Sequence, residues 1–220
     1  MIMERIICLI IGYLVGAVLQ TGYWYGKLNH VDIREFGSGN AGTTNVARKF
    51  GKKAGAVTYI VDAFKAVIAA VIVHFIFGNK ADNEILLFLY SGLGIVLGHN
   101  FPFYLNFKGG KGIAATSGVV ISLALFPTNL WILTVAGVLT FLIIVFTTKY
   151  VSLGSLIAVS AFFIEFVIFG FAGWLPVTGR VMYECFAVIF VIVVLAFVRH
   201  RGNISRLIHG TERKIGQKKA

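Results

Sequence analysis

The chain has 220 residues, of which 58% are hydrophobic and only 13% are charged, and its mean hydropathy is +0.86. Soluble domains carry about 25% charged residues, so this composition excludes an ordinary water-soluble protein and indicates one that spans a lipid bilayer. The net charge of +11 does not require a nucleic acid partner, because basic cytoplasmic loops and anionic lipid headgroups account for it.

Seven apolar stretches follow one another along the chain, and the fourth is the shortest. Each is expected to be a helix, because lipid offers no partner to an unpaired backbone amide and a crossing needs about 20 residues. The predicted spans cover residues 6–26, 55–78, 85–105, 112–126, 129–147, 151–170 and 181–198. The first lacks the small-residue cleavage site of a signal peptide and is expected to be retained. We therefore expect an all-α integral membrane protein with about seven transmembrane helices in a single domain, residues 1–220.

Basic residues are divided unevenly between the two sides that these spans define. One side receives three of them, namely Arg5, Lys80 and Arg180. The other side receives sixteen, namely Lys27, Arg34, Arg48, Lys49, Lys52, Lys53, Lys108, Lys111, Lys149, Arg199, Arg201, Arg206, Arg213, Lys214, Lys218 and Lys219. Because cytoplasmic loops carry the excess of Lys and Arg, we predict that the N-terminus lies outside and the C-terminus in the cytoplasm.

The first polar segment on the predicted cytoplasmic side is EFGSGNAGTTNVARKFGKK, residues 35–53. It contains G-x-G-x-x-G, but membrane spans surround it and no βαβ unit is present, which excludes a dinucleotide site. A turn rich in Gly, Ser, Asn and Thr presents backbone amides to an anion. Thr44 or Asn45 is expected to cap the following helix, with Arg48 one turn further on. The alternative is a flexible basic loop.

The second polar segment is KGGKG, which begins at Lys108. It is not a Walker A loop, because Gly112 stands where Ser or Thr is required. Glycines nevertheless allow a ligand to approach the backbone closely, and the N-terminus of the next helix favours an anion. Together with the charges of Lys108 and Lys111, this pattern predicts a phosphate-binding loop. The alternative is a loop whose lysines serve topology only, but such a loop would not need three glycines.

Two polar segments remain. TTKYVSLGS at 147–155 lies where the fifth span meets the sixth, and RHRGNISRLIHGTE at 199–212 follows the last span. On a helix that continues the last span, Arg199, Asn203 and Arg206 share one face, which indicates either a site or a headgroup-binding helix end. No group of residues has zinc-ligand spacing. No histidine has an aspartate five positions later, which excludes the acyltransferases that use that pair.

Two charged residues of the second span, Asp62 and Lys65, stand three positions apart and are expected to pair. Charge inside a membrane marks a functional site by default. Both residues lie near the cytoplasmic half of their helix, so a structural ion pair is an equally good interpretation.

Four segments resemble, in order and spacing, the bacterial acyl-phosphate:glycerol-3-phosphate acyltransferases of the PlsY type. They are GSGNAGTTNVAR at 37–48, GHNFPFYLNFKGGKGIAAT at 98–116, YVSLGS at 150–155 and RHRGNISRLIHGTE at 199–212. The resemblance implies transfer of a long-chain acyl group from acyl phosphate to the sn-1 hydroxyl of glycerol 3-phosphate. The products would be lysophosphatidic acid and inorganic phosphate, in the first step of phospholipid synthesis.

The resemblance also implies a multi-pass protein of the bacterial inner membrane, in contact with membrane lipids and with its active site on the cytoplasmic side. No metal and no cofactor is expected, because acyl phosphate is already activated and fixed cations stabilise developing charge. Two alternatives remain open. A transporter or channel for an organic anion would also explain seven spans and basic loops, and a phospholipid-binding regulator would need no turnover.

The expected site residues combine the polar segments with what the resemblance implies. The substrate-binding residues are Ser38, Asn40, Thr44, Asn45, Arg48, His99, Lys108, Gly109, Gly110 and Gly112. The catalytic residues are Lys111, Ser155, His200 and Asn203. By resemblance, the three glycines bind acyl phosphate, Ser38, Arg48, Lys111 and His200 bind glycerol 3-phosphate, and Ser155 and Asn203 position the reacting groups. A substrate phosphate oxygen is the implied proton acceptor, and neutral His200 is the alternative from the residues themselves.

Overall fold

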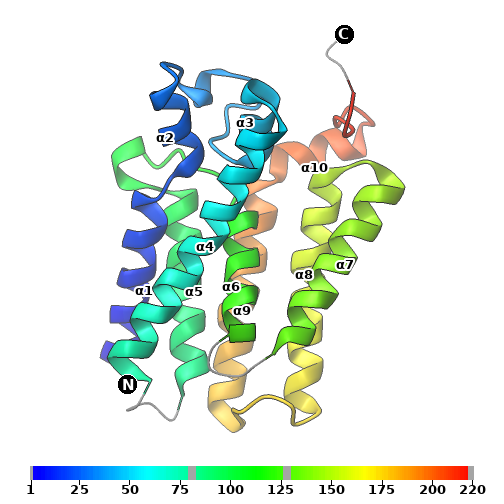
Figure 1. The fold of residues 1–220 in the computed structure, drawn as a ribbon. Coiled ribbons are helices and arrows are strands. Elements are labelled where there is room, and N and C mark those ends of the chain that lie inside the picture. Colours follow the sequence, from blue (N-terminus) through cyan, green and yellow to red (C-terminus); the bar gives the residue numbers. More distant parts are fainter. Residues whose placement is uncertain (1, 79–82, 126–129, 218–220) are drawn as a thin grey trace. The chain divides into compact units, whose positions relative to one another are not determined.

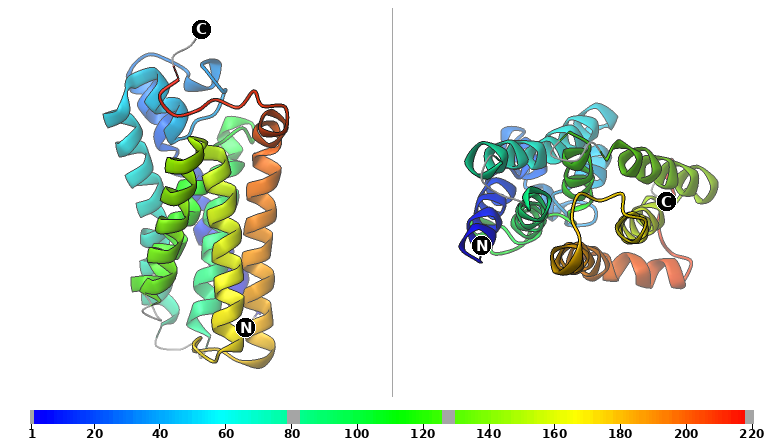
Figure 2. Two further views of the ribbon diagram at one scale, coloured as in Figure 1. Left: turned by 90° about the vertical axis from the view of Figure 1, so that its right-hand side faces the viewer. Right: turned by 90° about the horizontal axis from the view of Figure 1, so that it is seen from below.

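The structure is a computed structural model that describes residues 2–78, 83–125 and 130–217, and within these ranges the chain is helical and has no strand (Figure 1). The chain divides into two compact units, Met1–Asn129 and Leu130–Ala220. In each unit the long helices run side by side in alternating directions (Figures 1 and 2). A single functional domain over residues 1–220 stays a prediction.

The described residues of the first unit form six α-helices: α1 (Ile2–Val18), α2 (Thr21–Leu28), α3 (Thr43–Phe50), α4 (Lys52–Phe77), α5 (Glu84–Asn100) and α6 (Ile113–Leu125). Two short 3₁₀ helices, Ile33–Glu35 and Phe103–Leu105, lie in its loops. The second unit contains α7 (Trp131–Thr148), α8 (Val151–Phe171), α9 (Gly179–Arg199) and α10 (Arg201–Ile208).

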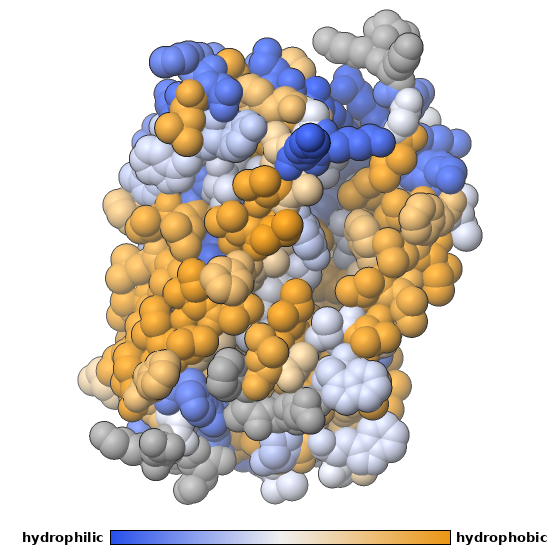
Figure 3. Space-filling view, in the orientation of Figure 1, coloured by the Kyte–Doolittle hydropathy of each residue, from blue (hydrophilic) through white to orange (hydrophobic). Residues whose placement is uncertain are grey.

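Six segments of the described chain are long and apolar enough to cross a membrane, namely Ile2–Leu28, Lys52–Phe77, Glu84–Leu105, Trp131–Thr148, Val151–Phe171 and Gly179–Arg199. They coincide with six of the seven predicted spans. The remaining predicted span, 112–126, is the 13-residue helix α6. That length is well below the roughly 20 residues of a full crossing, so a seventh crossing stays a prediction. Figure 3 shows hydrophobic side chains over the long helices of the first unit and hydrophilic ones over its loop end.

Four glycines form the contact between α1 and α5, and we call them the glycine seam: Gly12, Gly16, Gly94 and Gly98. On each helix the two glycines are four residues apart, which is the spacing that lets membrane helices approach at their backbones. A Cβ atom at Gly12 or Gly16 would overlap the carbonyl of Ser91 or Ile95. The seam therefore brings the backbones of α1 and α5 into direct contact and fixes the position of the α5 C-terminus.

The second unit is a helical hairpin followed by a third long helix and a turn. Gly154 of α8 packs against Val145 of α7. Phe166 of α8 meets Phe186 of α9 edge to face, with ring centroids 6.2 Å apart. Aromatic contacts of this kind add about 0.5–1.5 kcal/mol beyond the area they bury, so they reinforce the contact between these two helices.

The last long helix does not continue through its polar end. The α9 helix ends at Arg199, His200 occupies the junction with φ −98° and ψ 5°, and α10 starts at Arg201 in a new direction (Figure 1). The expectation that one continuous helix face carries Arg199, Asn203 and Arg206 is therefore wrong. The turn instead places Asn203 inside the unit, where it is buried.

Candidate active site

The loop between α2 and α3 is folded around the side chain of Asn45. Its Nδ2 atom donates to the carbonyls of Ile33 at 3.0 Å and Phe36 at 2.8 Å, and its Oδ1 atom accepts from the amide of Ser38 at 3.1 Å. With its amide engaged in this way and only 1% of the residue exposed, Asn45 shapes the loop. Direct contact between Asn45 and a substrate stays a prediction.

Helix α3 starts differently from the expected pattern. Its N-cap is Gly42, which makes no side-chain hydrogen bond to the helix, and Thr44 and Asn45 already lie within it. The expectation that Thr44 or Asn45 caps α3 is therefore wrong. The glycine takes the cap position because the Asn45 side chain faces the preceding loop instead of its own helix start.

A second set of contacts ties this loop to the segment that follows α5. Arg34 pairs with Asp32 at 2.7 Å, stacks over the Tyr23 ring at 5.0 Å and donates to the carbonyl of Leu105 at 3.4 Å. The hydrogen bond from Arg34 lowers the pKa of Asp32 to about 2. The pair is therefore ionised at neutral pH and joins the two loops at one end of the first unit.

The other expected binders of this loop are open to solvent. Ser38, Thr44 and Arg48 are exposed, whereas Asn40 is half-buried. Among the described residues, the buried Oδ1 atom of Asn40 has no hydrogen-bond partner. Because an unpaired buried acceptor costs about 1–3 kcal/mol, this atom is suited to accept a hydrogen bond from a ligand hydroxyl.

The KGGKG segment folds back onto the end of α5. The amide of Gly109 donates to the Asn100 carbonyl at 3.2 Å, and the amide of Gly110 donates to the His99 carbonyl at 3.0 Å. Both amides are therefore used to close the loop, and binding of acyl phosphate by these glycines stays a prediction. The amides expected to be free for an anion are those at the start of α6, where the first N–H groups of a helix have no acceptor within it.

The two glycines nearest α6 are required by close contacts. A Cβ atom at Gly110 would overlap the His99 ring at Nε2, and Gly112 has φ +83°, a conformation that residues with a side chain rarely adopt. Lys111 lies between them and is half-buried, whereas Lys108 is exposed. The glycines therefore allow the loop to pack against His99 and the chain to turn toward α6, with Lys111 shortly before the first residue of that helix.

The side chain of His99 is not open to solvent, because it closes a buried charged cluster. Lys65 Nζ lies 2.7 Å from His99 Nδ1 and 3.2 Å from Asp62 Oδ1, and it donates to the Leu19 carbonyl at 2.9 Å. Thr21 donates to the same Asp62 oxygen at 3.0 Å. The expected pairing of Asp62 with Lys65 is confirmed. The cluster joins α1, α2, α4 and α5 directly behind the KGGKG segment.

In the second unit, the residues of the C-terminal polar segment gather on one carboxylate, Glu212. Its Oε1 atom accepts from Asn203 at 2.6 Å and from Ser152 at 2.9 Å, and its Oε2 atom accepts from Arg206 at 2.6 Å. Burial opposes ionisation, but these three hydrogen bonds outweigh it and hold the pKa of Glu212 below its ordinary value. The carboxylate thus fixes the side chain of Asn203.

Sequence reasoning missed Glu212, although one signal was present. It is the only acidic residue after Glu184, in a segment dense with Arg and Lys. A lone carboxylate in such a segment is expected to have basic or amide partners. Nothing in the spacing indicated that one partner would be Ser152, which lies 60 positions earlier and is brought close by folding.

Two further predicted catalytic residues of this unit are engaged with the backbone. The Ser155 hydroxyl donates to the Val151 carbonyl at 2.8 Å. His200 is 3% exposed, and its Nδ1 atom lies 2.8 Å from the Ala196 carbonyl. Because a carbonyl only accepts hydrogen bonds, Nδ1 carries a proton, and in the neutral ring Nε2 is the basic nitrogen.

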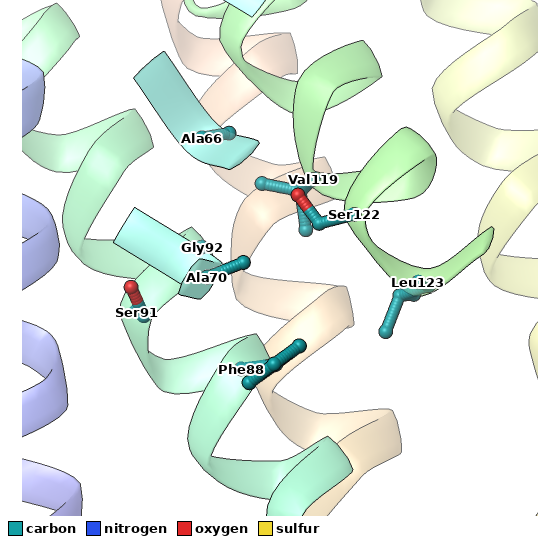
Figure 4. Close-up of a pocket in the computed structure, with 8 residues that line it drawn as sticks. All are labelled: Ala66, Ala70, Phe88, Ser91, Gly92, Val119, Ser122 and Leu123. Atoms are coloured by element: carbon teal, nitrogen blue, oxygen red, sulfur yellow. The ribbon is translucent and has the colours of Figure 1, made fainter. Parts of the chain in front are cut away.

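A small cavity of about 10 Å³ lies within the first unit. Figure 4 shows its lining from three helices: Ala66 and Ala70 of α4, Phe88, Ser91 and Gly92 of α5, and Val119, Ser122 and Leu123 of α6. This is about the space of one water, and the Ser91 hydroxyl has no hydrogen-bond partner among the described residues. Within the described ranges, no three His, Cys, Asp or Glu side chains lie close enough together to hold a metal ion.

Comparison with known proteins identifies relatives over nearly the whole chain. A profile of the glycerol-3-phosphate acyltransferase family matches residues 6–210. The glycerol-3-phosphate acyltransferase of Thermoanaerobacter sp. (strain X514) is 37% identical over 216 residues, 98% of each chain. That of Clostridioides difficile (strain 630) is 38% identical over 221 residues, covering 99% of this chain and 98% of the relative.

The structural comparison points the same way. Crystal structures of PlsY (YgiH), an integral membrane glycerol 3-phosphate acyltransferase, match this fold in two forms. The glycerol 3-phosphate form has a TM-score of 0.79 at 34% identity and covers 96% of each chain. The lysophosphatidic acid form has a TM-score of 0.78 at 33% identity and covers 96% of this chain and 95% of that one. The predicted all-α integral membrane fold is confirmed, and the chain belongs to the glycerol-3-phosphate acyltransferase family.

Proposed function

We propose that this enzyme transfers a fatty acyl group from acyl phosphate to the sn-1 hydroxyl of glycerol 3-phosphate, giving lysophosphatidic acid and inorganic phosphate. Family membership supports glycerol 3-phosphate as the acceptor. The donor is supported by one observation above all, the KGGKG segment seated on α5 at the N-terminus of α6. That geometry suits a small phosphate group.

The donor phosphate is proposed to bind where α6 begins. The first amides of the helix and its positive dipole end favour an anion. Lys111, half-buried next to Gly112, adds a full positive charge. Gly109 and Gly110 act by closing the loop through their amides, while Lys108, which is exposed, attracts the anion from solution. The acyl chain then extends from the phosphate toward the apolar helices.

The acceptor is proposed to bind at the loop that precedes α3. Glycerol 3-phosphate carries one phosphate and two hydroxyls. Arg48 and Ser38, both exposed, supply a cation and a hydroxyl for the phosphate. The partnerless Oδ1 atom of Asn40 accepts a hydrogen bond from a glycerol hydroxyl. Asn45 holds this loop in shape through the backbone.

The chemical step forms one ester bond and breaks one anhydride bond. The sn-1 oxygen attacks the acyl carbonyl carbon, the bond from that carbon to the phosphate oxygen breaks, and inorganic phosphate leaves with the bonding electron pair. The hydroxyl proton passes to a phosphate oxygen of the donor, so atoms and charge balance. Lysine charge and helix amides stabilise the developing negative charge, and holding both substrates in line supplies much of the rate.

His200 is the alternative proton acceptor, because its hydrogen bond to the Ala196 carbonyl leaves Nε2 as the basic nitrogen. Asn203, fixed by Glu212, cannot take a proton and is proposed to orient a reacting group. The Ser155 hydroxyl donates a hydrogen bond to the Val151 carbonyl, which suits direct transfer without an acyl-serine intermediate.

Purified protein in detergent tests the proposal. Incubation with palmitoyl phosphate and glycerol 3-phosphate is expected to release lysophosphatidic acid and inorganic phosphate in equal amounts. Palmitoyl-CoA in place of palmitoyl phosphate is expected to give no product. Efficient transfer from palmitoyl-CoA would overturn the choice of donor. No transfer from either donor, with uptake of glycerol 3-phosphate into sealed proteoliposomes, would indicate an organic-anion transporter instead.

A further inference from the structure

Asn100, the last residue of α5, has a side chain without a protein partner. The residue is 0% exposed, and neither its Nδ2 nor its Oδ1 atom makes a hydrogen bond to any described residue. A buried amide that forms no hydrogen bond costs several kcal/mol relative to water, depending on the reference state. Native proteins rarely retain such groups, so we expect a ligand to form hydrogen bonds with this amide.

The main chain around Asn100 is fixed by contacts from three segments. Gln20 donates to the carbonyls of Gly98 and His99 at 3.3 and 3.0 Å. Lys65 holds the His99 ring at 2.7 Å. The Gly109 amide donates to the carbonyl of Asn100 itself. These contacts come from α4, from the segment between α1 and α2, and from the KGGKG segment, and together they fix the end of α5.

The side chain of Asn100 lies beside the turn that leads into α6. A Cβ atom at Gly112 would lie 2.8 Å from Asn100 Oδ1, and Gly112 is the residue just before the first residue of the 13-residue helix. Two independent features therefore meet here: the unpaired N–H groups of a helix start and a buried amide that lacks a partner. Lys111, the neighbour of Gly112, brings positive charge to the same turn.

We propose that Asn100 is a substrate-binding residue. Rotation of its side-chain amide exchanges the positions of Oδ1 and Nδ2, and Nδ2 then donates to a phosphate oxygen of the acyl donor at the start of α6. This rests on the proposed function for the identity of the donor. The ligand chemistry follows from the site, since an amide donor, helix N–H groups and a lysine all favour a small oxyanion. Asn100 thereby belongs to the donor subsite and does not contact glycerol 3-phosphate.

The test uses Asn100→Leu, which removes both polar atoms at similar volume. If the amide awaits a ligand, this variant keeps or raises the thermal stability of the ligand-free protein, because an unsatisfied polar pair is replaced by an apolar group. Inorganic phosphate is expected to raise the melting temperature of the wild type but not that of the variant. The KM for palmitoyl phosphate is expected to rise by about tenfold or more, with the KM for glycerol 3-phosphate unchanged.

Ser91→Ala is the matched control. Ser91 also lies on α5 and also has a buried, unpartnered oxygen, but it lines the small cavity away from the KGGKG segment. This variant is expected to respond to phosphate as the wild type does.

Asn100→Asp, which keeps the shape and introduces a negative charge, is expected to abolish the phosphate response altogether.

Two contrary outcomes overturn the assignment, and a third separates it from the proposed function. Loss of folding in Asn100→Leu would show that the amide has a structural partner. An unchanged KM for palmitoyl phosphate, with an intact phosphate response, would show that the amide does not face the donor. A wild type that responds to inorganic phosphate but does not turn over palmitoyl phosphate would instead defeat the proposed function and leave Asn100 as an oxyanion-binding residue.

Discussion

At the scale of single residues, Lys111 is the side chain on which the proposed chemistry depends most. Lys111→Ala is expected to lower kcat/KM by at least about tenfold, because a hydrogen bond to a charged group is worth ~1.5–3 kcal/mol and ~1.4 kcal/mol is a factor of ten. Lys111→Arg should restore only part of the loss, because guanidinium is planar and larger than ammonium. Steady-state kinetics, with thermal unfolding to verify the fold, measures both.

Lys53→Ala is the control for this substitution, since Lys53 is exposed at the start of α4 and has no proposed contact with a substrate. It should leave kcat/KM within about twofold of the wild type, as surface substitutions usually do little. Near-normal kinetics in a folded Lys111→Ala protein would show that Lys111 contributes only to membrane orientation and not to catalysis.

Glu212 predicts a specific pH dependence of stability. Its pKa is lowered in the folded protein from an ordinary value of 4.5, so its ionised form contributes stability that is fully present above that value. This contribution is lost as the pH falls from about 4.5 through the lower folded pKa. Glu212→Gln should therefore melt at a lower temperature than the wild type near neutral pH, and the difference should shrink toward pH 3.

Thermal unfolding in detergent between about pH 7 and pH 3 measures how the difference in melting temperature between the wild type and Glu212→Gln decreases. Glu35→Gln, a change at an exposed acid of the first unit, is the matched control and is measured over the same range. A Glu212→Gln curve that runs parallel to the wild type would contradict the role of the ionised carboxylate.

The site could be predicted from the sequence only where the function depends on residues that are neighbours in the chain. KGGKG is such a case, since its glycines and lysines are consecutive and their placement next to α6 follows from the pattern. The engagement of the Gly109 and Gly110 amides could not be predicted, because their acceptors lie on α5. For the same reason Glu212 escaped notice: its partner Ser152 comes close only in the folded second unit.

At the scale of helices, the glycine seam makes a prediction that contrasts two glycines. A Cβ atom at Gly94 would overlap the Leu9 carbonyl, whereas one at Gly137 of α7 would meet nothing within 4 Å. Gly94→Ala should therefore destabilise the protein by about 1–3 kcal/mol through overpacking. Gly137→Ala should be neutral or stabilising by up to about 1 kcal/mol, because alanine favours helix.

Melting temperatures of Gly94→Ala and Gly137→Ala, measured in the same detergent, test this difference in stability. The seam would be refuted as a backbone contact if Gly94→Ala proved as stable as Gly137→Ala. A larger substitution, Gly94→Leu, should be worse than Gly94→Ala because the added atoms have no space at the seam.

Helix boundaries show where hydropathy succeeds and where tertiary contacts override it. Within the described residues, apolar runs located the six long apolar segments and the short α6 to within about four residues at each end. The break in the first span, at Leu19 and Gln20, was not predicted. Gln20 turns its side chain to the carbonyls of Gly16, Gly98 and His99, and these contacts exist only once α5 is in place. The turn after Arg199, which separates α9 from α10, was missed for a similar reason, because Asn203 is hydrogen-bonded to Glu212 inside the unit.

At the scale of the whole molecule, the distribution of basic residues predicts the orientation in the bilayer. Ala172, in the loop between α8 and α9, and Gln217, after α10, are both exposed. A cysteine at Ala172 should react with an impermeant thiol reagent added to intact cells, and a cysteine at Gln217 only after the membrane is opened. The opposite pattern would reverse the orientation and place the proposed site outside the cell.

The native cysteines do not disturb this measurement, because Cys8 and Cys185 are both buried. The unaltered protein is therefore the control and should remain unlabelled before and after the membrane is opened. Labelling of Ala172→Cys alone in intact cells would agree with a cytoplasmic C-terminus and with the inner-membrane location proposed for the enzyme.

The glycine seam also has a consequence for how the first unit is assembled during synthesis. Translation delivers α1 first, α4 next and α5 last, so the glycine face of α1 has no partner while α4 is being inserted. Lys65 enters the bilayer with Asp62 on its own helix, so the pair carries no net charge across the translocon. The hydrogen bond from Lys65 to the Leu19 carbonyl joins α4 to the end of α1 and involves no residue of α5. We therefore expect α1 and α4 to pair first and α5 to complete the cluster through His99 once it has been synthesised.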